Sequence, residues 1–260
     1  LDSSGLPQLM VHTRNPGFLE RGSLELLTLT PERTVRVAAR LDRLFGSMPD
    51  AIFGAGDRFG TGIAVLGDVD GTGKMTYLLG NPHPTASNIR QMRTIQPVGS
   101  GYCPPELQIV NQCPGHDDKS LASAAVGIGS DGFSSRTVGD EHGSAVAVIG
   151  DLNGDGHVDF ASGAPSSSGG AGGVYVVFGQ GAAMAAGTAS LQAQLILGSA
   201  LDASSSGVGA SVASAGDVND DGALDVYVGS PGHGAGKGAV VLAHLHSNGS
   251  LLSTKLLSSG

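Results

Sequence analysis

The sequence predicts an all-β fold made of short antiparallel strands joined by tight turns. Glycine accounts for 43 of the 260 residues, more than twice its usual share, and it lacks the strict three-residue period of collagen. Apolar residues make up 40% of the chain, which is too many for a disordered protein. Short runs rich in Val, Ile, Leu and Tyr alternate with Gly, Pro, Asn and Ser, as strands alternate with turns.

Three segments of the chain repeat one pattern. Each starts with a pair ending in Gly, continues through a Gly-Asp loop and ends in Gly-x-Pro; the segments are 59–82, 142–165 and 208–231. The first aspartates of their loops are 83 and then 66 residues apart. The longer spacing contains Cys103–Cys113, which we interpret as an insertion into one repeat. A period of this length predicts one supersecondary unit per repeat.

The apolar runs predict four strands in each of the last two units. They lie at 144–150, 158–162, 173–179 and 190–197, and again at 210–216, 224–228, 238–245 and 250–257. Four short antiparallel strands are the content of one β-propeller blade. We therefore predict about four blades in a single partial propeller, residues 1–260, with repeats at approximately 1–46 (incomplete), 47–130 (with the insertion), 131–197 and 198–260.

Both ends of the sequence are expected to cut a repeat. Leu1–Gly5 aligns with 69–73, so the first unit would begin inside a degenerate loop that keeps only Asp2 among its acids. A closed propeller commonly has about four to eight blades. Either these residues are a window on a longer chain, which we favour, or a neighbouring subunit completes the open blades through their edges.

Two loops carry the residue types of a calcium site at identical spacing, and we name them loop 2 (residues 151–159) and loop 3 (217–225). Positions 1, 3, 5 and 9 hold Asp151, Asn153, Asp155 and Asp159 in loop 2, and Asp217, Asn219, Asp221 and Asp225 in loop 3. Alternate positions of a tight loop direct oxygens toward one centre, and the position-7 carbonyl of His157 or Ala223 can add another. Hard oxygen ligands with three carboxylates favour Ca²⁺ over Zn²⁺.

An EF-hand and a polar turn are the alternatives to this interpretation of the loops. An EF-hand needs Glu at position 12, where the chain has Ser162 and Val228, and it needs flanking helices rather than strands. Asp, Asn and Gly can also form a merely polar turn. Because the same acid spacing occurs twice at equivalent repeat positions, we favour metal binding, with a mainly structural role for the ion.

An earlier copy, loop 1 (residues 68–76), is a weaker candidate. It has Asp68 and Asp70, but Thr72 and Thr76 replace the later acids. We list Asp68, Asp70 and Thr72 as a doubtful third calcium site.

The repeated pattern resembles the FG-GAP repeat of integrin α-subunit propellers and related extracellular proteins. The matching features are the Phe-Gly-like pair, the Gly-Asp-x-Asn-x-Asp-Gly loop and Gly-Ala-Pro, and they recur over nearly the whole chain. The resemblance implies an extracellular or cell-surface propeller, seven-bladed in integrins, that is stabilised by calcium and mediates adhesion.

Several weaker features occur in the sequence. We expect a disulfide between Cys103 and Cys113, with two free thiols as the alternative; zinc is disfavoured because only His116 lies near. Asn248-Gly249-Ser250 is an acceptor triplet for N-glycosylation in an expected hairpin turn. The Asp-x-Ser-x-Ser run at 202–206 resembles the metal site of von Willebrand A-type domains, although a plain linker is favoured. His244 and His246 are interpreted as a surface or packed pair rather than a zinc site.

Charge and missing motifs exclude several functions. The net charge of −9 disfavours nucleic acid and anionic lipid as partners, and no apolar stretch is long enough to span a membrane. No Gly-x-Ser-x-Gly, His-Glu-x-x-His or Gly-Lys-Ser/Thr pattern occurs, so we predict no enzyme activity.

Three functions remain. The leading one is an extracellular, calcium-stabilised propeller that binds a protein or glycan partner in adhesion. The second is a structural subunit of an extracellular fibril or surface assembly, joined to copies of itself through blade edges. The third is the non-catalytic propeller of a secreted enzyme.

Overall fold

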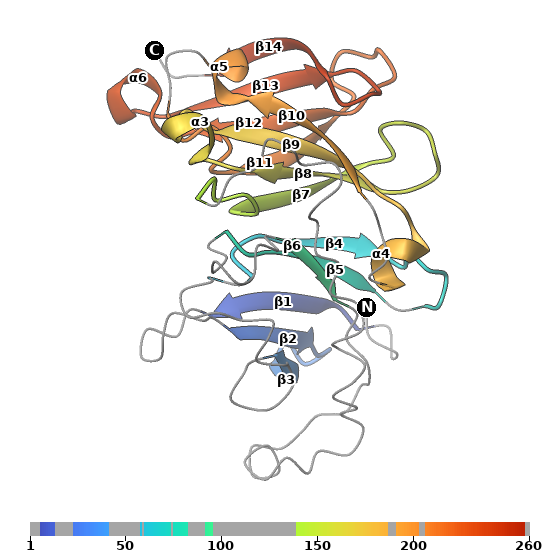
Figure 1. Cartoon of the computed structure of the whole chain (residues 1–260). Helices are drawn as coiled ribbons and strands as arrows, with labels where there is room; N and C mark the ends of the chain where they lie inside the picture. The colour runs from blue at the N-terminus through green and yellow to red at the C-terminus, as the bar shows by residue number, and fades with distance from the viewer. Residues whose placement is uncertain are drawn as a thin grey trace.

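The computed structural model of the chain describes residues 6–13, 23–41, 58, 60–73, 75–82, 92–95, 139–186, 191–202 and 206–257. Their strands form four antiparallel sheets, which follow one another in chain order (Figure 1). Sheet 1 contains β1 (Gln8–Thr13), β2 (Ser23–Leu29) and β3 (Val35–Leu41). Sheet 2 contains β4 (Ile63–Gly67), β5 (Thr76–Gly80) and β6 (Met92–Ile95).

The last two sheets have four strands each. Sheet 3 contains β7 (Ala145–Gly150), β8 (Asp159–Gly163), β9 (Gly173–Phe178) and β10 (Gln192–Leu197). Sheet 4 contains β11 (Val212–Gly216), β12 (Asp225–Ser230), β13 (Ala239–Leu245) and β14 (Leu251–Leu257). The short helices are α3 (Ser167–Gly170), α4 (Ala182–Ala186), α5 (Gly198–Leu201) and α6 (His233–Gly236).

The all-β expectation is confirmed, and the strands of sheets 3 and 4 lie within one or two residues of the ranges expected from the apolar runs. Each sheet is a meander in which consecutive strands pair. Among the described residues, no strand pairs sheet 1 with sheet 4, so propeller closure remains a prediction. The repeat boundaries also remain predictions, although each sheet lies within one expected repeat.

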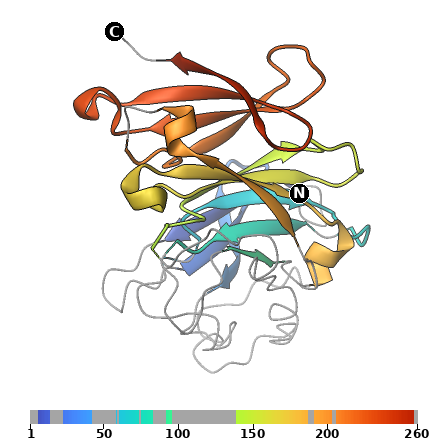
Figure 2. The same ribbon diagram turned by 45° about the horizontal axis from the view of Figure 1, so that its top comes forward.

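The four sheets are stacked, with sheets 1 and 4 at opposite ends (Figures 1 and 2). The first strands of sheets 2, 3 and 4 (β4, β7 and β11) are neighbours along this stack. One apolar core fills the space between sheets 2 and 3 and includes Leu66, Leu78, Phe160, Tyr175 and Val177. A second core joins sheets 3 and 4 and includes Val174, Val176, Val226, Val228 and Val241. Burial of each such side chain contributes about 1.5–3 kcal/mol, so these two cores hold the stack together.

Glycines set how closely the sheets approach. A Cβ added to Gly80 of sheet 2 would lie 1.9 Å from the carbonyl oxygen of Gly143, which precedes sheet 3. A Cβ on Gly163 of sheet 3 would lie 1.9 Å from the carbonyl oxygen of Gly209, which precedes sheet 4. Any side chain there would clash with backbone. This contact explains the glycines of the Gly-x-Pro and Phe-Gly-like motifs in physical terms.

Some expectations fall on residues that the structure does not describe. These are the Cys103–Cys113 disulfide with the neighbouring His116, the degenerate loop at Leu1–Gly5, and Ser204 of the Asp-x-Ser-x-Ser run. In the described ranges, no helix has the length and apolar character needed to cross a membrane.

Candidate metal centre

Loops 1, 2 and 3 connect the first two strands of sheets 2, 3 and 4 through the same bulged hairpin. In each hairpin the strand register shifts by one residue just before the loop, and the glycine preceding position 1 pairs with position 9. These glycines have positive φ, +89° at Gly67, +101° at Gly150 and +73° at Gly216. An L-residue rarely adopts this conformation, so the Gly-Asp dipeptide fixes where each loop leaves the sheet.

The side chains at positions 1, 3 and 5 of loop 2 converge on one another. The Asp155 amide donates to Asp151 Oδ1 at 3.0 Å and to Asn153 Oδ1 at 3.1 Å, so these two oxygens share one donor. The Gly156 amide donates to Asp151 Oδ2 at 2.8 Å. Asn153 Nδ2 donates to Asp155 Oδ2 at 3.0 Å. Three oxygen-bearing side chains therefore gather at the exposed rim of the loop.

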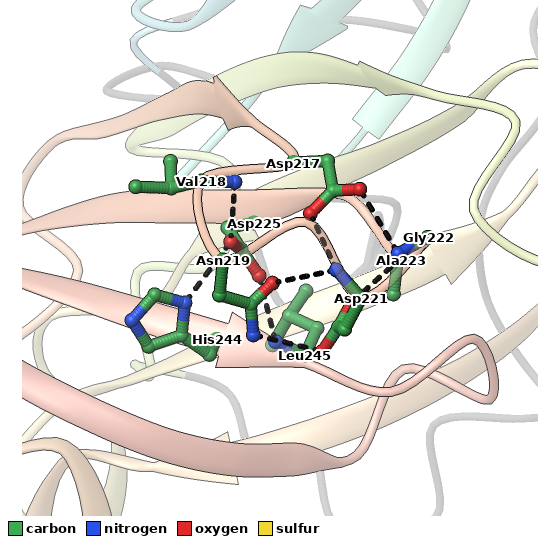
Figure 3. A network of polar contacts seen from close by, with 9 residues as sticks. All are labelled: Asp217, Val218, Asn219, Asp221, Gly222, Ala223, Asp225, His244 and Leu245. Carbon is green, nitrogen blue, oxygen red and sulfur yellow. Dashed lines mark hydrogen bonds and ion pairs between the residues drawn. The ribbon is translucent and has the colours of Figure 1, made fainter.

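Loop 3 repeats this arrangement, as Figure 3 shows. The Asp221 amide donates to Asp217 Oδ1 at 3.1 Å and to Asn219 Oδ1 at 3.4 Å. The Gly222 amide donates to Asp217 Oδ2 at 2.9 Å, and Asn219 Nδ2 donates to Asp221 Oδ2 at 2.8 Å. Loops 2 and 3, which share their residue pattern in the sequence, therefore also share their side-chain hydrogen bonds in the structure.

Loop 1 adopts the same backbone shape with fewer acids. The Thr72 amide donates to Asp68 Oδ1 at 3.0 Å and to Asp70 Oδ1 at 3.1 Å, and the Gly73 amide donates to Asp68 Oδ2 at 2.8 Å. The Thr72 hydroxyl donates to Asp70 Oδ1 at 2.7 Å. An acid at position 5 or 9 is therefore not needed to shape this loop.

The position-9 aspartates lie beneath the rim and are fully buried. Asp159 Oδ2 accepts from the Leu152 amide at 2.8 Å and from the Asn153 amide at 3.4 Å. Its Oδ1 accepts from the Gly179 amide, just after β9, at 2.8 Å. One carboxylate thus ties the loop to the third strand of its sheet.

Asp225 holds loop 3 in the same way (Figure 3). Its Oδ2 accepts from the Val218 amide at 3.0 Å, and its Oδ1 accepts from the Leu245 amide at 3.1 Å. His244 Nδ1 lies 3.0 Å from Asp225 Oδ2 and has no counterpart in loop 2, where Phe178 occupies the equivalent place. Loop 3 therefore has an imidazole beside its buried carboxylate, and loop 2 has an aromatic hydrocarbon.

The surroundings of three loop aspartates shift their pKa values, downward for Asp155 and Asp221 and upward for Asp159. Hydrogen bonds from the Asn153 side chain and the His157 amide lower the pKa of Asp155. Those from the Ala223 amide and the Asn219 side chain lower the pKa of Asp221. Burial raises the pKa of Asp159, against the opposing effect of its backbone donors. Asp155 and Asp221 are therefore readily ionised, as ligands for a cation must be.

The donor set suits a hard divalent cation. Each of loops 2 and 3 gathers two carboxylates and one amide oxygen at the rim, with no sulfur or imidazole at those positions. Within the described part of the chain, no three His, Cys, Asp or Glu side chains are grouped so that they could hold a metal ion. In each loop the third carboxylate, Asp159 or Asp225, is buried and accepts hydrogen bonds from backbone amides. The side-chain oxygens of Asp151, Asn153 and Asp155 are of the chemical type that calcium prefers. The buried Asp159 carboxylate holds the loop by accepting its backbone amides.

Other residues singled out in the sequence lie outside this arrangement. Asn248 is exposed in the turn between β13 and β14, and its Oδ1 accepts from the Ser250 amide and hydroxyl. His246 lies just past the end of β13 and is exposed. His244 is the one of the two that lies within hydrogen-bond distance of Asp225, whereas both imidazoles, in addition to its hydrogen bonds, lower the pKa of Asp221 in loop 3 through their charge. Asp202 Oδ2 accepts from the Ser230 hydroxyl at 3.1 Å and lies 2.7 Å from His233 Nδ1, which links the end of sheet 3 to sheet 4.

Sequence reasoning missed the partners of position 9. The amides of Gly179 and Leu245 lie 20 residues from the aspartates they bind, and a backbone donor leaves no mark in residue type. His244 could have been found, because it lies 19 residues after Asp225 near the end of the third expected strand.

Comparison with known families agrees with this geometry. The family model for the FG-GAP repeat matches residues 142–177, a segment that contains loop 2 and most of β7, β8 and β9. Residues 142–177 are an FG-GAP repeat. No curated protein matches the chain.

The FG-GAP repeat and the segment that follows it share their loop geometry. Loop 2 lies inside the repeat, and loop 3 reproduces its hydrogen bonds 66 residues later at the same place in the next sheet. The hydrogen bonds of loop 2 therefore recur in sheet 4, outside the residues that the family model matches.

Proposed function

We propose that this chain forms part of an extracellular, calcium-stabilised FG-GAP propeller that binds a protein or glycan partner in adhesion. The observation that supports it most is the pair of rim clusters in loops 2 and 3, built from the same residue types on the same hairpin. FG-GAP repeats are typical of extracellular and surface proteins and are generally non-catalytic, which fits the lack of a catalytic pattern.

Calcium would act mainly as a structural ligand. Asp151, Asn153 and Asp155 of loop 2, and Asp217, Asn219 and Asp221 of loop 3, would hold one ion each, and the position-7 carbonyls of His157 and Ala223 are further candidate donors. The ion supplies positive charge between carboxylates that repel each other. An ion that binds only the folded chain stabilises it by about 2.7 kcal/mol per site at a hundredfold excess over its Kd.

The loops also supply the candidate partner surface. Loops 2 and 3 leave adjacent sheets at the same strand ends, because each joins the first strand of its sheet to the second. Ca²⁺ in both loops would make the backbone there rigid and reduce the entropy lost when a partner binds.

Urea unfolding in excess Ca²⁺ and in excess EGTA tests the calcium proposal. We expect a higher unfolding midpoint with Ca²⁺ for the wild type, and a smaller difference for D221N, which removes a rim charge from loop 3. D220N is the matched control, because Asp220 is an exposed acid of the same loop at position 4, outside the proposed ligand set. Equal midpoints in Ca²⁺ and EGTA for the wild type would overturn the proposal.

A further inference from the structure

Two asparagines of the chain, Asn153 and Asn248, are each followed by glycine. Asn219, the counterpart of Asn153 in loop 3, is followed by Asp220 instead. An asparagine side chain can cyclise when the backbone nitrogen of the next residue attacks its Cγ atom. A following glycine favours this attack, because it has no Cβ to block the approach and leaves the backbone free to rotate. Asn153 and Asn248 are therefore equal candidates by sequence, and their surroundings in the structure differ.

In loop 2 the attacking nitrogen is accessible. Asn153 and Gly154 are both exposed, and none of the described residues accepts a hydrogen bond from the Gly154 amide. Gly154 has a φ of +74°, and a Cβ placed there would meet nothing within 4 Å. The Asp155 amide donates to Asn153 Oδ1 at 3.1 Å, so it can stabilise the negative charge that develops on this oxygen during the attack.

The turn that holds Asn248 restrains the same atoms. The Gly249 amide donates to the carbonyl oxygen of His246 at 2.8 Å. A Cβ placed on Gly249 would lie 2.9 Å from Phe178 Cζ and 3.1 Å from Val176 Cγ1, so the turn packs on sheet 3. Attack on Asn248 would break this hydrogen bond and move the turn off sheet 3, and both changes add to the activation barrier.

Loop 3 keeps the geometry of loop 2 without the glycine. Asn219 makes the same side-chain hydrogen bonds with Asp221 that Asn153 makes with Asp155 (Figure 3). Asp220 has a φ of +57°, the backbone region that Gly154 adopts in loop 2. Its Cβ crowds the approach to Asn219 Cγ, and its negative charge disfavours loss of the amide proton. Attack on Asn219 is therefore hindered in a loop of the same shape.

We propose that Asn153 is a site of spontaneous deamidation, and that Asn248 is protected by packing and Asn219 by Asp220. Hydroxide removes the Gly154 amide proton, the nitrogen bonds to Asn153 Cγ, and the Cγ–Nδ2 bond breaks. The leaving group departs as ammonia after taking a proton from water. Water then opens the cyclic imide at Cγ, which yields aspartate, or at the backbone carbonyl, which yields isoaspartate. The net change is hydrolysis of one side-chain amide, without oxidant or reductant.

This reaction would alter loop 2 and spare loop 3. Aspartate at position 3 adds a carboxylate to those of Asp151 and Asp155. Isoaspartate directs the main chain through the side chain and adds a methylene group to it, so the alternate spacing of positions 1, 3 and 5 is lost. Under the proposed function this consequence falls on the calcium site of loop 2, whereas the reaction itself does not depend on calcium.

Peptide mapping by mass spectrometry, after incubation in heavy-oxygen water, tests the proposal on the chain produced without glycans and kept in EGTA. Heavy oxygen enters the side chain only where deamidation occurs during the incubation. In the folded wild type we expect Asn153 to react roughly tenfold faster than Asn248 or Asn219, which corresponds to about 1.4 kcal/mol in the activation barrier. In the chain unfolded by urea, Asn153 and Asn248 should react at similar rates. Equal rates at these two residues in the folded chain, or no reaction at Asn153, would overturn the proposal.

Exchanging the residues at position 4 tests the protection of loop 3. D220G gives loop 3 an Asn-Gly pair and should raise the rate at Asn219 to that at Asn153. G154D gives loop 2 the residue of loop 3 and should lower the rate at Asn153 to that at Asn219. The rate at Asn248 in the same samples is the internal control and should stay unchanged. Failure of D220G to make Asn219 reactive would contradict the role of Asp220, and the comparison within the wild type requires neither variant to fold.

Discussion

Loops 1 and 2 have the same backbone shape and different acids. In both, the amides at positions 5 and 6 donate to the aspartate at position 1, and a glycine of positive φ precedes the loop. Loop 1 achieves this with threonine at positions 5 and 9, whereas loop 2 has Asp155 and Asp159 there. The shape therefore does not require three carboxylates, and their mutual repulsion in loops 2 and 3 calls for another purpose. The Ca²⁺ ion that we propose for these loops would offset that repulsion.

Asp159→Ala should give the largest loss of stability. Comparing it with Asp155→Ala tests whether the buried acid contributes more to folding than the rim acid. It removes the acceptor of three backbone amides, two of them from the loop and one from beyond β9. We expect a loss of about 3 kcal/mol in the free energy of unfolding, measured by urea titration in EGTA. Asp155→Ala at the rim should change it by less than about 0.5 kcal/mol under the same conditions. Equal losses for the two variants would contradict the separate roles.

Gly150→Ala and Gly67→Ala compare loops 2 and 1 at the residue before each loop. Both glycines have positive φ, but a Cβ at Gly150 would also lie 2.7 Å from Leu224 Cδ1, while a Cβ at Gly67 meets nothing within 4 Å. We expect losses of about 2 kcal/mol for Gly150→Ala and about 1 kcal/mol for Gly67→Ala in chemical unfolding. A larger loss at Gly67 would show that the two hairpins are not equivalent.

Giving loop 1 the rim residues of loop 2 tests whether those residues are sufficient for calcium binding. The double variant D70N/T72D gives loop 1 the Asp, Asn and Asp of positions 1, 3 and 5. We expect Ca²⁺ at tenfold excess over the new Kd to add about 1.4 kcal/mol to the stability of the variant beyond its effect on the wild type. Asp70→Asn alone is the control and should gain nothing. No gain in the double variant would mean that the buried position-9 aspartate is required for binding.

The sequence predicted the regular features of this molecule because they depend on local patterns. Apolar runs placed the strands of sheets 3 and 4, and the Gly-Asp spacing placed the loops between first and second strands. What it could not place were contacts between distant segments. Asp159 was predicted as a calcium ligand together with Asp155, which stays a prediction. Its burial and its hydrogen bond from the Gly179 amide beyond the third strand could not be read from the sequence.

Asp202 illustrates the same limit. Its local pattern, Asp-x-Ser-x-Ser, resembles a metal site in which the nearby serines would be the partners of Asp202. In the structure its carboxylate lies against Ser230 and His233, about thirty residues further along, because sheet 4 folds back over the end of sheet 3. Likewise His244 could be placed on its strand from the sequence, but its contact with Asp225 depends on the register of β12 against β13.

Isothermal titration of the calcium-free chain with Ca²⁺ tests the central claim most directly. Loops 2 and 3 predict two ions per chain, and the variant D155N/D221N, which loses one rim carboxylate in each loop, should bind neither with measurable heat. D220N should keep both sites. Binding of no calcium by the wild type, or unchanged binding by D155N/D221N, would contradict the assignment of the two rim clusters as calcium sites.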